Sequence, residues 1–223
     1  MLHLGSVGRT SIDVDFNFFF LVLLFVYFNY DPQRGIQYAL LWIPIVFVSV
    51  LVHELAHAGA IAMLGFGASE IVLTGMGGVT MNRRRAAPWQ DLIISLAGPA
   101  ASFGLYFLCG WLARYVALVH TDKMLSALIP YLAWANRAWG LFNLIPVPPL
   151  DGGHATRELF GTFLTARNAF IVSIWIAMVG GAGIAVYFAV WERSFLLALY
   201  IGWFVYMAFG QWQYFKRHGV PGD

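Results

Sequence analysis

The stretch Tyr38–Leu64, YALLWIPIVFVSVLVHELAHAGAIAML, is apolar along nearly its whole length yet contains the pentapeptide HELAH. It exceeds the roughly 20 apolar residues that a membrane-spanning helix needs. On a helix, His53 and His57 share one face, and this spacing suits two nitrogen ligands of one tetrahedral zinc. Glu54 is then placed to take a proton from metal-bound water. Because ionisable residues at membrane depth usually mark function, the stretch predicts a metal-dependent hydrolysis site inside a bilayer.

The composition supports a membrane location for the whole chain. Of 223 residues, 60% are hydrophobic and only 11% are charged, against about 45–50% and about 25% in soluble domains. The formal net charge of +2, without basic runs interleaved with aromatic residues, predicts no nucleic-acid partner. Cys109 stands alone in an apolar run, so we expect a small buried residue, with no internal disulfide and no cysteine-type zinc site.

Apolar runs predict an all-α membrane protein, a polytopic bundle of about six transmembrane helices. The predicted spans are 14–30, 38–64, 91–119, 124–145, 169–190 and 194–214. Gly98-Pro99 should kink or locally break the third span. The polar first 15 residues do not resemble a signal peptide, so we expect the first apolar run to remain as a span.

Four short segments are typical of strands rather than helices, because Ile12, Val14 and Phe16 alternate with polar residues and a glycine-containing turn separates the segments of each pair. They form two hairpin-like pairs, and they are Leu2–Leu4, Ser11–Asp15, Ser69–Thr74 and Gly78–Asn82. The fold class therefore includes a small membrane-associated β-sheet beside the helices.

The distribution of Lys and Arg predicts the orientation in the membrane. With six spans both termini share a side, and that side holds most of the cations: Arg9, Arg83, Arg84, Arg85, Arg157, Arg167, Lys216 and Arg217. We therefore expect a multi-pass protein of the cell (plasma or inner) membrane, if prokaryotic, with both termini cytoplasmic. His53 and His57 would lie in the cytoplasmic half of the second span.

A third zinc ligand is expected from the segment Asn143–His154, NLIPVPPLDGGH. Its three prolines should end the fourth helix, and Gly152-Gly153 should permit a tight backbone excursion. This arrangement would hold Asp151 at a helix end, where its carboxylate can bind a metal. Asn143 could direct an amide N–H at an oxyanion in the same cavity, although an ordinary interhelical hydrogen bond is an equal alternative.

Taken together, these motifs resemble the site-2 protease family of intramembrane zinc metalloproteases. HExxH followed by N-x-x-P-x-x-x-x-D-G carries the resemblance, at His53, Glu54, His57, Asn143, Pro146, Asp151 and Gly152. The order of parts is also similar, with the Gly77-Gly78 hairpin before Ala97-Gly98-Pro99. Residues 1–223 would form a single domain of a minimal member without PDZ or CBS domains. Ser102 stands where many relatives have Asn.

The resemblance implies a zinc-dependent endopeptidase that cleaves transmembrane segments of membrane-tethered proteins, as in regulated intramembrane proteolysis. Zn²⁺ would be held by His53, His57 and Asp151, with Glu54 as general base and Asn143 polarising the scissile carbonyl. The partners would be a single-span substrate and the lipid bilayer. The strand edge at Gly77 and Gly78 would hold the unwound substrate by strand pairing.

Several alternatives remain at this point. The same cluster could be the transport site of a metal permease, although no second copy of either motif suggests paired halves. The chain could also be an inactive scaffold, which the intact Glu54 argues against. Asp151 could simply form a turn, and His154 is expected to support a ligand or lie in a loop. The triplet Arg83–Arg85 should anchor to headgroups, and the glycines of Gly180–Gly183 should permit close helix packing.

Overall fold

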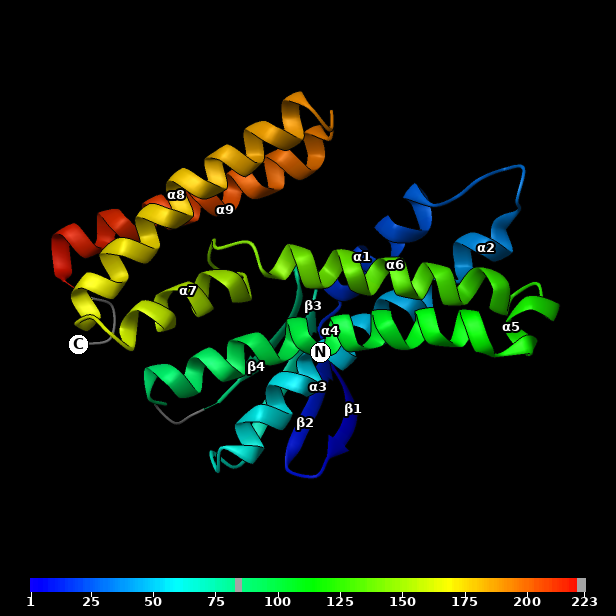
Figure 1. Ribbon diagram of the computed structural model, residues 1–223, viewed down its shortest axis with the longest axis horizontal. Coiled ribbons are helices and arrows are strands. Elements are labelled where there is room, and N and C mark those ends of the chain that lie inside the picture. The colour runs from blue at the N-terminus through cyan, green and yellow to red at the C-terminus, as the bar shows by residue number, and fades with distance from the viewer. Residues whose placement is uncertain (83–85, 220–223) are drawn as a thin grey trace. The chain divides into compact units, whose positions relative to one another are not determined.

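The computed structural model describes residues 1–82 and 86–219 (Figure 1). The chain divides into two compact units. Unit 1 comprises Met1–Arg85 and Ala97–Leu141, and unit 2 comprises Ala86–Leu96 and Phe142–Asp223. The triplet Arg83–Arg85, predicted to be a headgroup anchor, lies outside the described residues.

Unit 1 contains a four-stranded sheet with the order β1-β2-β3-β4. The strands are β1 (Leu2–Val7), β2 (Thr10–Val14), β3 (Ser69–Thr74) and β4 (Gly77–Met81). The outer pairs are antiparallel hairpins, and β2 pairs with β3 in parallel. The predicted small sheet is confirmed, and β4 forms one of its edges.

The buried face of this sheet explains its alternating sequence. Ile12 pairs with Ile71 and Val14 pairs with Leu73 across the parallel strands. All four side chains are buried and join a core cluster with residues of α3 (Trp42–Met63) such as Val46 and Val50. Period-two burial along β2 thus sets which face of the sheet packs against this helix.

The ends of α3 follow helix-capping rules. Pro44 lies in the first turn, where its missing N–H disrupts no helical hydrogen bond. After Leu64, Gly65 adopts a left-handed φ of 80°. The Gly65 amide donates to the Ala62 carbonyl and the Phe66 amide to the Ile61 carbonyl, which is a Schellman motif. The chain can therefore leave the helix about two turns after His57 and enter β3.

The other helices that lie wholly or mostly in unit 1 are shorter than predicted or displaced. They are α1 (Asn17–Phe28), α2 (Ile36–Leu40), α4 (Pro88–Tyr115), α5 (Ala117–Thr121) and α6 (Leu125–Asn143). The helix α4 continues through Pro99 without the break that the sequence suggested. It ends at Tyr115 rather than near Val119, because Val116 takes an extended conformation before α5.

Unit 2 is built from α7 (Asp151–Gly161), α8 (Ala166–Val190) and α9 (Phe195–His218). The side chain of Thr165 caps α8 by accepting a hydrogen bond from the Asn168 amide. The helices α8 and α9 pack along each other, as Figure 1 shows. Their shared core with the segment before α7 includes Val147, Phe170, Ile174 and Phe204.

Four helical segments among the described residues are long and apolar enough to cross a membrane. They are Ile36–Met63, Pro88–Tyr115, Ala166–Val190 and Phe195–His218. The twelve residues of α1 span only about 18 Å at about 1.5 Å per residue. A hydrocarbon core is about 30 Å thick. The chain is thus a mostly helical membrane protein, while the predicted number of six spans stays a prediction.

Candidate metal centre

Helix α3 buries both histidines and the acid between them. The side chains of His53, Glu54 and His57 are 2%, 4% and 6% exposed. The imidazole centroids of the two histidines lie 4.9 Å apart. Helical spacing of four residues, predicted from the sequence, therefore does place both rings together.

A glycine of α4 shows which way the two rings face. A Cβ built on Gly98 would collide with Nε2 of His57 and would lie 2.6 Å from Nε2 of His53. Both Nε2 atoms thus converge on the same small space beside the Gly98 backbone. Two converging imidazole nitrogens, with room kept by a missing side chain, fit a zinc ion well.

Ser102, one turn after Gly98 on α4, orients the first histidine. Its hydroxyl is fully buried and lies 3.0 Å from Nδ1 of His53. When Nε2 binds a metal, Nδ1 carries the proton and donates it to the serine oxygen. Ser102 therefore gives the His53 ring a buried polar partner.

Strand β4 contacts Glu54 through Thr80 and Gly78. The Thr80 hydroxyl lies 2.7 Å from Oε2 of Glu54 and donates a hydrogen bond to it. A Cβ on Gly78 would overlap the carboxylate group of Glu54. The hairpin glycine is therefore required so that β4 can approach α3.

Trp139 of α6 packs beside the same residues. Its ring is 6.3 Å from that of His53, nearly perpendicular to it. A Cβ on Gly77 would meet the Trp139 ring at 2.8 Å, and Gly77 has a φ of 120°. One turn earlier, Asn136 is fully buried and donates a hydrogen bond to Ser49 of α3. These contacts fix α6 against the histidine-bearing helix.

In unit 2, Asp151 is half-buried and is the first residue of α7. A carboxylate at a helix N-terminus is stabilised by the helix dipole. The preceding chain turns tightly, with the Val147 amide donating to the Ile145 carbonyl and the Leu150 amide to the Val147 carbonyl. Asn143, the last residue of α6, is 9% exposed.

The predicted role of Gly152-Gly153 as a tight excursion is wrong. Both glycines are helical residues of α7. A Cβ on Gly152 would collide with the backbone of Leu144, and one on Gly153 would collide with the backbone at Val147. The two glycines are needed because the first turn of α7 packs directly on the chain that precedes it.

The glycine-rich stretch of α8 is partly explained by packing. A Cβ on Gly181 would contact Val205 and Val147 at 2.6 Å and 2.7 Å, whereas Gly180 and Gly183 face open space. The prediction of close helix packing therefore holds at Gly181.

His154 is exposed and faces a cavity of about 370 Å³ within unit 2. Arg157 also lines this cavity, with its guanidinium 5.7 Å from the Phe170 ring centroid. Next to it, burial raises the pKa of Glu158, with Arg157 opposing the shift and Asp91 adding to it. Charged groups of both signs therefore lie close together on this side of α7.

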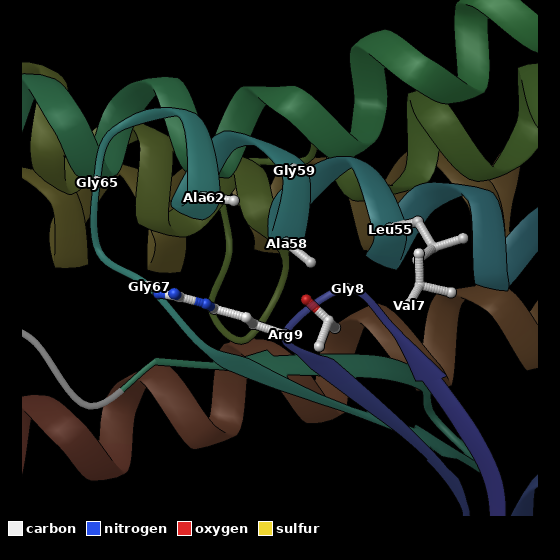
Figure 2. Close-up of a pocket in the computed structure, with 10 residues that line it drawn as sticks. Val7, Gly8, Arg9, Leu55, Ala58, Gly59, Ala62, Gly65 and Gly67 are labelled. Carbon is white, nitrogen blue, oxygen red and sulfur yellow. The ribbon is translucent and has the colours of Figure 1, made fainter.

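A cavity of about 390 Å³ lies in unit 1 between the β1–β2 turn and α3, as Figure 2 shows. It is lined by Arg9 from the turn and by three small residues of α3, Ala58, Gly59 and Ala62. No acidic residue is among the described residues that line it. Leu55 of the HELAH pentapeptide lines the cavity, but His53, Glu54 and His57 do not.

Comparison with known proteins decides the family. Residues 18–147 match the family described as Peptidase M50B-like, and residues 114–185 match Peptidase family M50. The chain belongs to the M50B-like peptidase family. The family match confirms the resemblance to the site-2 protease family that the motifs indicated.

Its relatives include two proteins whose names contain the description zinc metalloprotease. Rip3 of Mycobacterium tuberculosis is 33% identical over 171 residues, which is 72% of this chain and 42% of the relative. The zinc metalloprotease MJ0392 of Methanocaldococcus jannaschii is 29% identical over 177 residues, covering 78% and 49%. The chain thus spans less than half the length of these relatives.

A solved structure has the same fold. The site-2 protease from Methanocaldococcus jannaschii superposes with a TM-score of 0.65, covering 94% of each chain at 24% identity. This likeness extends over both units.

The structure also supplies neighbours of the motif that sequence reasoning did not find. These neighbours include Thr80 and Trp139, and the structure also gives Gly98 a packing role. Ser102 was noted in the sequence only as a departure from the family. Each lies 26 or more residues from the histidine or glutamate that it contacts. A buried polar side chain in an apolar helix, as at Ser102, is the one sequence signal that could have suggested such a role.

Proposed function

We propose that this M50 peptidase is a zinc-dependent intramembrane endopeptidase that cleaves transmembrane segments of membrane-tethered proteins. The convergence of the two Nε2 atoms on the space beside Gly98 carries the proposal. His53, His57 and Asp151 are the proposed ligands, and two imidazoles with one carboxylate are a donor set that could hold zinc. The zinc named in the relatives' descriptions supports the same cofactor.

The chemistry follows from the residues that surround the ligands. A bound zinc would supply Lewis acidity and lower the pKa of a water to about 7. Glu54 then accepts a proton from the attacking water and later donates it to the leaving amine. Asn143 is proposed to hold the scissile carbonyl by donating from its amide. Burial of Glu54 keeps this proton transfer away from bulk solvent.

Strand β4 is the proposed binding site of the substrate. It is an edge strand, and its outward-facing residues Val79 and Met81 are each 48% exposed. An unpaired edge with apolar side chains is suited to adding an extended peptide. A helical substrate must unwind first, because its carbonyls are otherwise hydrogen-bonded within its own helix. Gly77 and Gly78 would let this edge lie close to Glu54.

The proposed substrate is a protein with a single transmembrane span. We further propose six membrane crossings, with α1 and α6 added to the four longer segments, and both termini in the cytoplasm of a prokaryotic cell. The excess of Lys and Arg on that side supports the orientation.

The test is the substitution Glu54→Gln in the full chain, reconstituted in phospholipid vesicles. The probe is a synthetic peptide with one apolar segment of about 20 residues, interrupted by a central Gly-Pro step that weakens its helix. Cleavage should fall by at least about 100-fold while bound zinc is retained, because the general base is lost and the ligands remain. The control Glu70→Gln changes an exposed acid of β3 and should cleave normally.

Cleavage that survives Glu54→Gln would contradict the protease proposal. Zinc or proton flux into the vesicles that needs Glu54, in the absence of cleavage, would instead support a permease.

A further inference from the structure

Thr80 lies on the face of β4 that meets the catalytic helix. It pairs with Ile71 of β3, and its side chain is half-buried. Its strand neighbours Val79 and Met81 point to the other, exposed face, as the alternation of a strand requires. Thr80 is therefore the polar side chain that the proposed substrate strand presents to α3.

The Thr80 hydroxyl contacts Glu54 at two atoms. Its Oγ1 is 2.7 Å from the carboxylate oxygen Oε2 and 3.2 Å from the main-chain carbonyl oxygen of the same residue. A hydroxyl has one proton to donate, and the shorter bond to the charged group is the stronger. Fixing Oε2 fixes the plane of the carboxylate and hence the direction of Oε1.

Gly78, two residues earlier on the same strand face, leaves the space that the carboxylate occupies. The Glu54 side chain occupies the volume that a Cβ of Gly78 would fill. The strand therefore supplies both the space for the carboxylate and the hydrogen bond that holds it. A glutamate has three rotatable side-chain bonds, and the hydrogen bond to Thr80 reduces this freedom.

We propose that Thr80 is the positioning residue of the general base: its hydroxyl aims the Glu54 carboxylate from the strand on which the substrate is seated. The inference rests on the proposed protease function. Because small misplacements of a catalytic group cost a large part of the rate, loss of the hydroxyl should affect the chemical step more than substrate binding. Strand β4 would then both hold the substrate at its edge and position the general base.

The substitutions Thr80→Val and Thr80→Ser test this in the full chain with the same vesicle assay. Valine keeps the shape and suits a strand, but it cannot donate a hydrogen bond. We expect Thr80→Val to lower kcat by about 10- to 100-fold, as for a lost hydrogen bond to a charged group. KM should change by less than about twofold, and bound zinc should not change. Thr80→Ser should restore kcat to within about threefold of the original.

The matched control is Thr10→Val, which removes a buried strand hydroxyl bonded to Ser69 Oγ at 2.9 Å, away from Glu54. It should leave kcat unchanged. The background of Glu54→Gln gives a second readout, because Thr80→Val should cause no further loss of residual cleavage once the carboxylate is absent.

Three results would overturn the inference: unchanged kcat in Thr80→Val, equal loss in Thr80→Val and Thr80→Ser, or a change in KM alone. The two failures are distinguishable. If Glu54→Gln is inactive and Thr80→Val is fully active, only the role of Thr80 is lost. If Glu54→Gln remains active, the protease proposal itself is lost.

Discussion

At the scale of single residues, His53 is the most closely supported group of the motif. Ser102 hydrogen-bonds its Nδ1, Trp139 packs edge-on to its ring, and Gly98 leaves the space that its Nε2 faces. Metal-binding histidines depend on such partners for their tautomer and orientation. The zinc affinity of the proposed site should therefore depend on residues that bind no metal.

Removal of the Ser102 hydroxyl should weaken zinc binding. We expect Ser102→Ala to lower zinc affinity by about 10- to 100-fold, because Nδ1 of His53 loses its partner in a fully buried position. Competition with a chelator measures the affinity. The control Ser173→Ala removes a buried serine hydroxyl that bonds only locally, to the Phe170 carbonyl of the same helix. Equal zinc affinity in both variants would contradict the role of Ser102.

A single methyl group at Gly98 should have a larger effect. Gly98→Ala places a Cβ among the Nε2 atoms of both histidines, which are buried and have little room to move. We expect zinc to be lost from the purified protein, as measured by metal analysis. Gly104→Ala, on the same helix but facing open space, should keep its zinc. Full zinc occupancy in Gly98→Ala would show that the rings do not bind a metal through Nε2.

The sequence identifies the motif residues but not their supports, for a physical reason. His53, Glu54 and His57 are neighbours on one helix, so their spacing alone predicts their common face. Ser102 and Thr80 reach the motif over 49 and 26 residues. Their contacts depend on how α4 and β4 pack against α3, and no local periodicity encodes that packing.

At the scale of elements, the sheet was predictable and α7 was not. Burial alternates along β2, so its inward residues Ile12 and Val14 could be predicted from the sequence, whereas three consecutive residues of β3, Ile71–Leu73, are buried. The helix α7 begins with Asp-Gly-Gly, which locally favours a turn. Close packing of Gly152 and Gly153 on the preceding backbone overrides this preference.

Helix α7 should also make stability depend on pH through Glu158. Burial raises its pKa above the ordinary value of 4.5, so the folded state binds this proton more tightly than the unfolded state. Stability from this group is therefore lost as the pH rises above about 4.5. Glu158→Gln should have nearly the original melting temperature near pH 4.5 and a higher one at pH 8.

Thermal unfolding of the detergent-solubilised chain at several pH values measures this effect. Glu70→Gln, at an exposed acid, is the control. A melting-temperature difference that is the same at every pH would show that titration of Glu158 is not the cause.

The apolar helices were predictable in position but less so in length. Hydropathy located α3, α4, α8 and α9, since each is long and nearly uniformly apolar. The first predicted span loses its start to β2 and retains only the twelve residues of α1. The fourth, α6, contains the buried Asn136 and the exposed Arg137, which lower its apolar character.

At the scale of the whole molecule, the proposed zinc ligands stand far apart in the sequence. The histidines belong to unit 1, and Asp151 belongs to unit 2. The proposed third ligand, Asp151, stands 98 residues after His53 in the chain. Sequence reasoning proposed this ligand from the prolines and glycines around Asp151 and from the family motif, because the separation along the chain carries no geometric information.

The most direct test of this account is X-ray absorption at the zinc edge of the purified full chain. Two imidazole nitrogens and one carboxylate oxygen should appear at about 2.0–2.2 Å, with the remaining position held by water. Asp151→Ala should remove one oxygen scatterer, and His57→Ala should remove one imidazole. A spectrum unchanged by Asp151→Ala, or purified protein that binds no zinc at all, would contradict the proposed centre.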